Sequence, residues 1–209
     1  MSNATQPFGL RPVRYMTGSP WNGATVKCFV SADYATALFI GDPIIISPTA
    51  GEDDTTNTNY YPKINRATAD DDGATDCIIR GVIVSFDPSP TLGLQYVYNP
   101  ASTERIANVV MDYNVIYQIR GDGAGTPATD WISRNACCTS GSGSTVTGLS
   151  GFLLDEGTES APESIQADPL EIVGIAHMPD NTLADYCIWE VRLNTHFNTT
   201  GMVLGVSDA

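Results

Sequence analysis

Short apolar runs separated by turn residues account for most of the chain. They are rich in β-branched and aromatic residues, which favours strands over helices. The clearest run is 186–193, where apolar positions alternate with Glu190 and Arg192. Its apolar residues are Cys187, Trp189, Val191 and Leu193. This period of two predicts a half-buried strand with Trp189 as its anchor in the core.

The same pattern predicts further strands at 26–30, 44–46, 77–86, 94–98, 105–111, 115–119 and 170–176. The run 77–86 is almost continuously apolar, so we expect both faces of that strand to be covered. No segment sustains a helical period. Thr126 and Pro127 suit the N-cap and first position of a helix, which would extend over Ala128–Ile132 for one or two turns. The pattern therefore predicts an all-β fold, a mainly antiparallel sandwich or barrel with the jelly roll as one form, and at most one short helix.

Three segments with many acidic and small polar residues are predicted to be long acidic surface loops. They are 48–60, 67–76 and 155–168. Because these loops interrupt the apolar pattern without dividing it, we expect residues 1–209 to form a single β-rich domain. An N-terminal arm at 1–10, with residues 1–7 disordered, and a flexible C-terminal tail at 200–209 complete the predicted organisation.

The charge of the chain limits what it can bind. It has 24 acidic against 10 basic residues, a formal net charge of -14, and 42% hydrophobic residues, enough for a packed core. The negative charge disfavours nucleic acid and anionic membrane surfaces, because phosphates and carboxylates repel each other. No apolar run is long enough to span a bilayer and the N-terminus lacks a secretory pattern, so we expect synthesis in the cytoplasm.

The cysteines are odd in number and lack the spacing of a zinc site. They are Cys28, Cys77, Cys137, Cys138 and Cys187. In a reducing compartment, such cysteines usually pack as small apolar side chains, so we predict packing instead of disulfides or metal ligation.

Few residues offer catalytic or metal-binding chemistry in a recognisable pattern. Asp70–Asp72 lacks the alternating spacing of a calcium loop, so a solvated acidic loop is favoured over a metal site. His177 and His196 are the only histidines, and no nucleophile elbow accompanies them. Gly121–Gly125 has neither the lysine nor the helix of a phosphate-binding loop. We predict no catalytic residue, no cofactor and no metal.

The N-terminal region differs from the rest because it concentrates positive charge. Arg11 and Arg14 are two of only ten basic residues. They lie close to the aromatic residues Phe8, Tyr15 and Trp21. Arginine and aromatic residues are enriched at protein–protein contacts, so these five residues are candidates for an interface with another protein chain. The alternative is an ordinary strand with arginine side chains extended along its surface.

Several segments, taken in their order along the chain, resemble a known family. They are Phe8–Tyr15, Gly18–Gly23, Ala32–Pro43, Thr147–Gly151, Pro179–Asn181 and Val191–Phe197. In these segments the chain resembles the capsid cement or decoration proteins of tailed bacteriophages. The resemblance extends from Phe8 to Phe197, is weakest in the acidic loops, and rests on the order of the segments because no single motif is diagnostic.

The resemblance implies a structural virion protein and not an enzyme. Such a protein is made in the cytoplasm of the bacterial host, sits on the outer capsid surface, and stabilises contacts between major capsid protein subunits. The expected partners are the major capsid protein and further copies of the chain, most simply as a homotrimer, with neither nucleic acid nor membrane.

Two other functions remain open at this point. One is a tail- or surface-associated virion protein that binds a receptor or carbohydrate through converging exposed aromatics. The candidates for that site are Trp21, Tyr60, Tyr61 and Trp131. The other is a hydrolase that uses a carboxylate pair, for which 24 acidic residues provide no specific signal.

Overall fold

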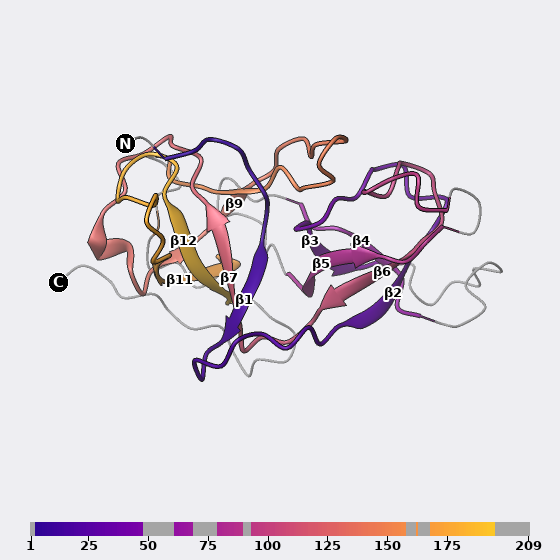
Figure 1. The fold of residues 1–209 in the computed structure, drawn as a ribbon, viewed down its shortest axis with the longest axis horizontal. Helices are drawn as coiled ribbons and strands as arrows, with labels where there is room; N and C mark the ends of the chain where they lie inside the picture. Colours follow the sequence, from indigo (N-terminus) through magenta and orange to yellow (C-terminus); the bar gives the residue numbers. More distant parts are fainter. Residues whose placement is uncertain are drawn as a thin grey trace.

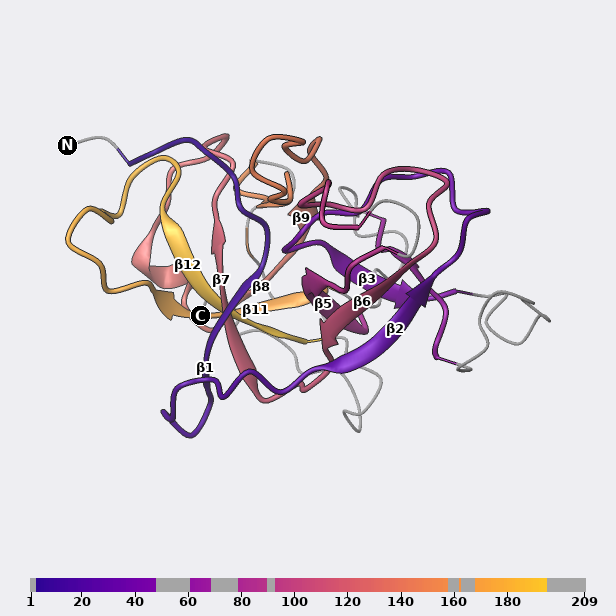
Figure 2. The same ribbon diagram turned by 45° about the vertical axis from the view of Figure 1, so that its right-hand side comes forward.

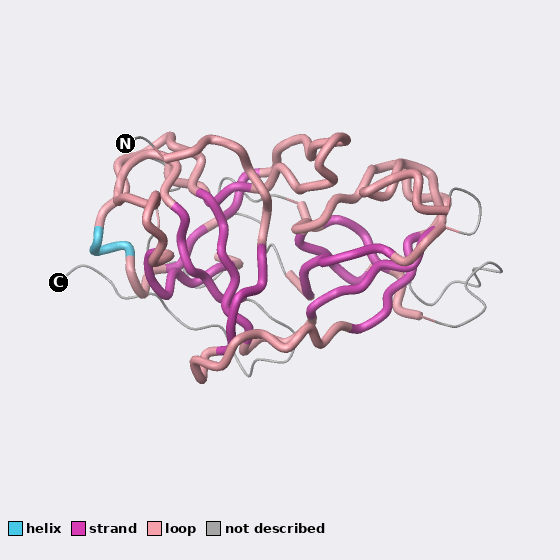
Figure 3. Tube along the Cα trace, viewed as in Figure 1, coloured by secondary structure: helices cyan, strands magenta, loops and turns pink. Residues whose placement is uncertain are grey.

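The computed structural model describes residues 3–47, 61–68, 79–89, 93–157, 162 and 168–194. Within these residues, two five-stranded antiparallel sheets and one two-stranded sheet make up the fold (Figure 1). The described helical structure is one 3₁₀ turn, η1 (Thr129–Trp131), drawn in cyan in Figure 3. The prediction of an all-β, mainly antiparallel fold with at most one short helix is confirmed. The helix does not start at Thr126, because its N-cap is Ala128.

The first sheet has the strand order β1-β7-β12-β11-β8. Its strands are β1 (Arg11–Tyr15), β7 (Val115–Arg120), β12 (Ile188–Leu193), β11 (Leu170–Ile175) and β8 (Asn135–Ala136). Trp189, Val191 and Leu193 of β12 point into the core, whereas Glu190 and Arg192 are only partly buried. The predicted alternation in this strand is therefore confirmed, with Trp189 completely buried.

The second sheet has the strand order β2-β6-β5-β3-β4 and curls around its own small core. Its strands are β2 (Val26–Val30), β6 (Arg105–Val110), β5 (Gly81–Phe86), β3 (Pro43–Ile46) and β4 (Ile64–Arg66). Each strand contributes at least one residue to that core: Cys28, Ala107, Ile83, Ile44 and Ile64. The edge strands β2 and β4 approach where the Phe29 N–H donates to the Pro62 carbonyl at 2.8 Å. This contact does not close a barrel, since the two strands meet at one parallel bridge.

A larger core joins the two sheets, which lie side by side along the long axis of the molecule (Figures 1 and 2). Val82 and Val110 of the second sheet pack in the same cluster as Tyr117 and Trp189 of the first. Ile83, the neighbour of Val82, points into the smaller core of the second sheet. The prediction that both faces of this strand are covered is therefore confirmed for Val82 and Ile83, whereas Ser85 of the same strand is exposed and residues 77–78 lie outside the described part. The short sheet of β9 (Cys138–Thr139) and β10 (Leu153–Leu154) contributes Cys138 and Leu154 to the larger core.

Three segments distant in the sequence meet at one place, here termed the three-segment junction: residues 8–10, 39–42 and 148–152. The middle segment bonds to both others. The Leu10 N–H donates to the Gly41 carbonyl at 2.9 Å, and the Ser150 N–H donates to the Ile40 carbonyl at 2.8 Å. The Gly41 N–H donates in turn to the Ile83 carbonyl of β5 at 2.8 Å. The junction therefore ties the chain that leads into β1 to the second sheet.

Glycine is required at the junction for two reasons. Gly9 and Gly41 have φ angles of +70° and +95°, a region that other residues rarely adopt. A Cβ atom on Gly41 would also lie 2.4 Å from the Phe8 carbonyl oxygen. The backbones can approach this closely only because neither residue carries a side chain.

The N-terminal segment is not the free arm that the sequence predicts, at least from residue 3 onward. Asn3 is buried, and its side-chain amide donates to the carbonyls of Thr182 at 2.9 Å and Asp185 at 3.0 Å. The Arg120 guanidinium donates to the carbonyls of Ala4 and Gln6. These bonds attach the segment to the end of the first sheet, so the expectation of disorder over residues 3–7 is wrong.

The predicted strand 94–98 is also wrong. Its alternating aromatic residues form a loop, because Arg105 donates to the carbonyls of Tyr96 at 3.1 Å and Tyr98 at 2.8 Å. The predicted tail 200–209 and most of the predicted acidic loops lie outside the described residues.

Replacing Trp189 by Ala should lower the free energy of unfolding by about 3 to 5 kcal/mol, because it removes a completely buried ring from the larger core. The exposed Leu183 is a suitable control, and its replacement by Ala should cost less than about 0.5 kcal/mol. Urea denaturation of both variants measures the difference. Equal effects would contradict the position of Trp189 in the core.

The junction is tested by comparing two glycines with nearly the same φ angle. Gly18, at +90°, has no atom within 4 Å of an added Cβ, so Gly18→Ala should show only the backbone strain of about 1 to 2 kcal/mol. Gly41→Ala should cost at least about 2 kcal/mol more, because the new methyl group meets the Phe8 carbonyl. Thermal unfolding of the two variants decides this, and equal destabilisation would mean that the junction tolerates a side chain.

Candidate functional site

The outer face of the first sheet, opposite Trp189, carries a row of polar side chains from four neighbouring strands. We call this row the polar ladder. Its members are Arg11 and Arg14 of β1, Gln118 of β7, Glu190 and Arg192 of β12, and Glu171 of β11. Side chains of adjacent antiparallel strands that share a face lie close together, so these residues contact each other across the sheet.

Each arginine of the polar ladder has a partner in the same chain. Arg11 Nη2 donates to Gln118 Oε1 at 2.7 Å, and Arg14 Nη2 lies 2.6 Å from Glu190 Oε2. Arg192 Nε donates to an oxygen of Glu171 at 2.6 Å. The pair of Arg14 and Glu190 is half sheltered, with 34% and 15% of the two side chains exposed.

These contacts bear on the predicted interface role of Arg14. Its carboxylate partner in the structure is Glu190 of the same chain. Whether the same face also contacts a second protein stays a prediction. A guanidinium has five N–H donors, so an arginine with one partner in its own chain can still bind another group.

The five residues predicted for the interface separate into two groups. Phe8 lies with Arg11, whose guanidinium is 4.8 Å from the centre of the Phe8 ring. Arg14 belongs to the polar ladder. Tyr15 and Trp21 pack at the edge of the larger core, and the Trp21 backbone N–H donates to the Val13 carbonyl at 3.1 Å. The structure therefore brings Phe8, Arg11 and Arg14 to the outer face and assigns Tyr15 and Trp21 partly to the core.

Positive charge on the polar ladder contrasts with the rest of the molecule. All ten basic residues lie in the described part of the chain, and three of them, Arg11, Arg14 and Arg192, are on this face. The ladder contains two acidic residues, Glu171 and Glu190, so its formal charge is +1 on a chain of -14. Of the chain's surfaces, this face is therefore well suited to approach an acidic or neutral partner.

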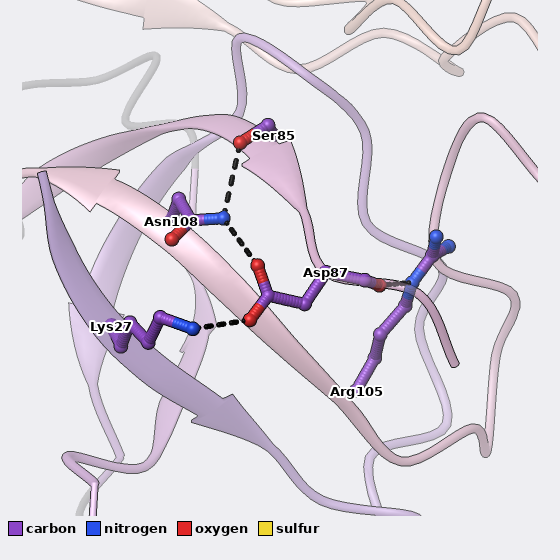
Figure 4. A network of polar contacts seen from close by, with 5 residues as sticks. All are labelled: Lys27, Ser85, Asp87, Arg105 and Asn108. Atoms are coloured by element: carbon purple, nitrogen blue, oxygen red, sulfur yellow. Dashed lines mark hydrogen bonds and ion pairs between the residues drawn. The ribbon is translucent and has the colours of Figure 1, made fainter. Parts of the chain in front are cut away.

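A second polar network joins three strands of the second sheet (Figure 4). Lys27 Nζ of β2 lies 2.6 Å from Asp87 Oδ2, while Asn108 Nδ2 of β6 donates to Asp87 Oδ1 at 2.9 Å and to Ser85 Oγ at 3.1 Å. Arg105 Nε donates to the Asp87 carbonyl at 2.7 Å. Hydrogen bonding to Lys27 lowers the pKa of Asp87, and the same bond raises the pKa of Lys27. The amine is thus held as a cation, which suits an ion pair and opposes nucleophilic attack.

Glu156 is the least expected side chain, because it is completely buried although it follows Asp155 in a predicted acidic loop. Trp189 Nε1 donates to its Oε1 at 2.8 Å, and the Gly123 N–H donates to its Oε2 at 3.0 Å. A Cβ on Gly121 would lie 2.0 Å from Oε1, so this glycine leaves the space that the carboxyl group fills. The glycine-rich segment Gly121–Gly125, which lacks the features of a phosphate-binding loop, thus surrounds the Glu156 carboxyl group.

Burial raises the pKa of Glu156 to about 7, although the hydrogen bonds from Trp189 and Gly123 lower it. The negative charges of Asp122 and Asp185 add to the increase. Glu156 is therefore a described carboxyl group whose pKa lies close to neutral pH. No signal in the sequence around position 156 identifies it, because the burial depends on glycines more than thirty residues away.

The stability of the protein should depend on pH through Glu156. Folding raises its pKa from 4.5 to about 7, so the folded state favours the protonated form. That contribution is complete below about pH 4.5 and is lost as the pH rises to about 7, a change of about 3 kcal/mol. Glu156→Gln should remove this part of the pH dependence in denaturant titrations between these pH values.

Glu104→Gln is the matched control, since it makes the same chemical change at a partly exposed carboxyl group. Burial also raises the pKa of Asp42, so the wild-type slope is not due to Glu156 alone and the difference between variants is the relevant quantity. A Glu156→Gln variant with the wild-type slope would contradict the assignment.

The remaining catalytic and metal-binding candidates from the sequence are only partly described by the structure. Asp70–Asp72 and His196 lie outside the described residues, and His177 is exposed. No group of three or more His, Cys, Asp and Glu suited to a metal ion occurs among the residues with described positions.

Four cysteines are buried and not joined in disulfides, so the prediction of packing in place of disulfides is confirmed for them. They are Cys28, Cys137, Cys138 and Cys187, whereas Cys77 lies outside the described part. Burial raises the pKa of Cys28 to about 12 and that of Cys187 to about 11, which disfavours thiolate chemistry at these two positions.

Trp131, a candidate for carbohydrate binding, is a core residue instead. It is buried against Trp189, with 5.7 Å between the ring centres. Trp21 is partly buried at the edge of the same core, Tyr61 is partly exposed, and Tyr60 lies outside the described residues. Trp131 is therefore not available for the predicted carbohydrate-binding site of converging exposed aromatic residues.

Comparison with family models, curated proteins and solved structures finds no match to this chain. Among the described residues, no helix has the length and apolar character needed to cross a membrane.

Proposed function

We propose that this chain is a capsid decoration protein that binds the outer surface of a bacteriophage shell and braces neighbouring major capsid protein subunits. The observation that carries the proposal is the polar ladder. It presents three arginines on the face of a five-stranded sheet, in a chain whose formal charge is -14. In the proposed complex, this face contacts the shell, and the copies of the chain form a homotrimer.

The ladder is suited to this role by its geometry. Its charged pairs join β1 to β12 across β7 and β12 to the adjacent β11, and they are only partly exposed, so little side-chain freedom remains to be removed on binding. The strands themselves provide a rigid surface over which Arg11, Arg14 and Arg192 keep fixed positions. A rigid clamp of this kind needs no cofactor and no moving part.

The distribution of the resemblance also supports the proposal. Three of its segments, Phe8–Tyr15, Ala32–Pro43 and Thr147–Gly151, meet at the three-segment junction. Another part, Pro179–Asn181, includes Asn181, whose side chain donates to the carbonyls of Ala176 and Ile188 at 2.9 Å. The resemblance therefore falls on residues that determine how the chain folds.

Copy number distinguishes a shell protein from a tail protein. Quantitative mass spectrometry of virions from the phage that encodes this chain should find on the order of hundreds of copies, because lattice symmetry multiplies a shell component. About a handful of copies would instead favour the receptor-binding alternative at the tail.

The contribution of the polar ladder is tested by exchanging one ion pair. Replacing Arg11 and Arg14 by Ala should leave the β-sheet circular dichroism unchanged and weaken binding to emptied capsids. The expected decrease is about 1 to 3 kcal/mol for each partly buried hydrogen bond to the shell that the substitutions remove. The control carries Arg14→Glu together with Glu190→Arg, which keeps the net charge and allows the ion pair to form within the chain.

If the polar ladder only stabilises the fold, the variant with Arg14 and Glu190 exchanged should bind capsids as the wild type does. If the polar ladder contacts the shell, the exchanged variant should also bind capsids with lower affinity. Its midpoint of denaturant unfolding should stay at the wild-type value. Unaltered capsid binding by both variants would refute this role for the outer face.

A further inference from the structure

Two neighbouring loops contain no charged residue, although the chain as a whole is strongly acidic. They are 93–103 and 139–151, here termed the charge-free loops, and they consist mainly of Gly, Ser, Thr, Tyr and aliphatic residues. The loops touch each other, because a Cβ on Gly148 would lie 2.6 Å from the Val97 carbonyl oxygen. They lie above the second sheet in the view of Figure 1, and a charged group from β4, the Arg66 guanidinium, donates to the Gly141 carbonyl at 2.8 Å.

The charge-free loops carry the two most exposed large apolar side chains in the described part of the chain. Val146 is 87% exposed and Leu94 is 79% exposed, and Val97 adds a third apolar side chain at 50%. A contiguous exposed apolar patch usually indicates an interaction site, and these three side chains lie on two loops that touch each other. Loops rich in Tyr, Ser and Gly are also typical of surfaces that bind other proteins.

Both loops are fixed in place before any partner arrives. Arg105 holds the first through the carbonyls of Tyr96 and Tyr98, and the Tyr98 ring stacks on Phe39 with 5.0 Å between ring centres. In the second loop, the Gly148 N–H donates to the Ser144 carbonyl at 2.8 Å. A surface that is already ordered has little conformational entropy to give up when it binds.

We propose that the charge-free loops are the surface through which copies of this chain associate with each other. The reason is electrostatic. A foreign partner can offer cations to an acidic surface, but a second copy carries the same net charge of -14 and cannot do so. Copies can therefore approach at the least electrostatic cost where neither surface is charged, and around a symmetry axis the same loops of each copy can meet.

This assignment deepens the proposed function by naming the face used for self-association, and it rests on that function only for the place of the oligomer on a capsid. It also assigns capsid binding and self-association to two different surfaces, whereas the sequence offers the N-terminal arginines as candidates for both. The outer face of the first sheet contacts the shell, and the charge-free loops contact the other copies of the chain.

Sedimentation velocity of the full chain tests the proposal with two matched variants. Val146→Glu places a carboxylate at the tip of the charge-free loops and should raise the dissociation constant of self-association at least about tenfold. Val26→Glu makes the same change on β2, where Val26 is 45% exposed, and should leave association unchanged. Wild-type association should strengthen between about 0.05 and 0.5 M salt, because salt screens the repulsion between copies.

The proposal is overturned if the wild type stays monomeric at every concentration and salt level, or if Val26→Glu weakens association as much as Val146→Glu. Capsid binding, measured on the same samples, shows whether a failure concerns self-association through the loops or the proposed capsid function. A monomeric wild type that still decorates capsids refutes self-association through the loops alone. A wild type that associates through the loops but never binds capsids supports the loops and refutes the capsid function.

Discussion

The close approach of backbone at the three-segment junction is the constraint on which the rest of the structure depends. Gly9 and Gly41 allow the chain before β1 to hydrogen-bond to the segment before β3, and Ser150 bonds to the same segment from the other side. Arg66 of β4 completes the contact by stacking over Phe152 at 4.6 Å. The junction thereby fixes the second sheet relative to the start of the first, and so determines where the polar ladder and the charge-free loops lie on one body.

The use of positive charge explains how the protein can be both stably folded and strongly acidic. Its few cations mostly stabilise the chain itself: Arg120 and Arg105 bind backbone carbonyls, and Lys27 binds Asp87. Only the polar ladder gathers several arginines on one outward face. The remaining acidic side chains give the chain its net charge of -14, which opposes contact between two copies.

The sequence predicts those parts of the fold that obey a local period. The alternation in β12, the covered faces of β5 and the absence of long helices among the described residues all follow from apolar spacing. Two-residue strands such as β8 are too short to produce a pattern, and the loop at 94–98 imitates a strand until Arg105 occupies its carbonyls. Glu156 could not be found either, because its burial depends on Gly121 and Trp189, which are remote in the sequence. The sequence singles out Arg14, but its partner Glu190 is set by strand register, which spacing along one segment does not reveal.

The proposal that this chain decorates a phage capsid is tested most directly by electron cryomicroscopy of the virions. The account predicts density for the two-sheet body on the outer surface of the capsid, with the outer face of the first sheet against the shell. The charge-free loops should meet around the local symmetry axis. Density for this body in the tail, or on the capsid with the polar ladder turned towards solvent, would contradict the account.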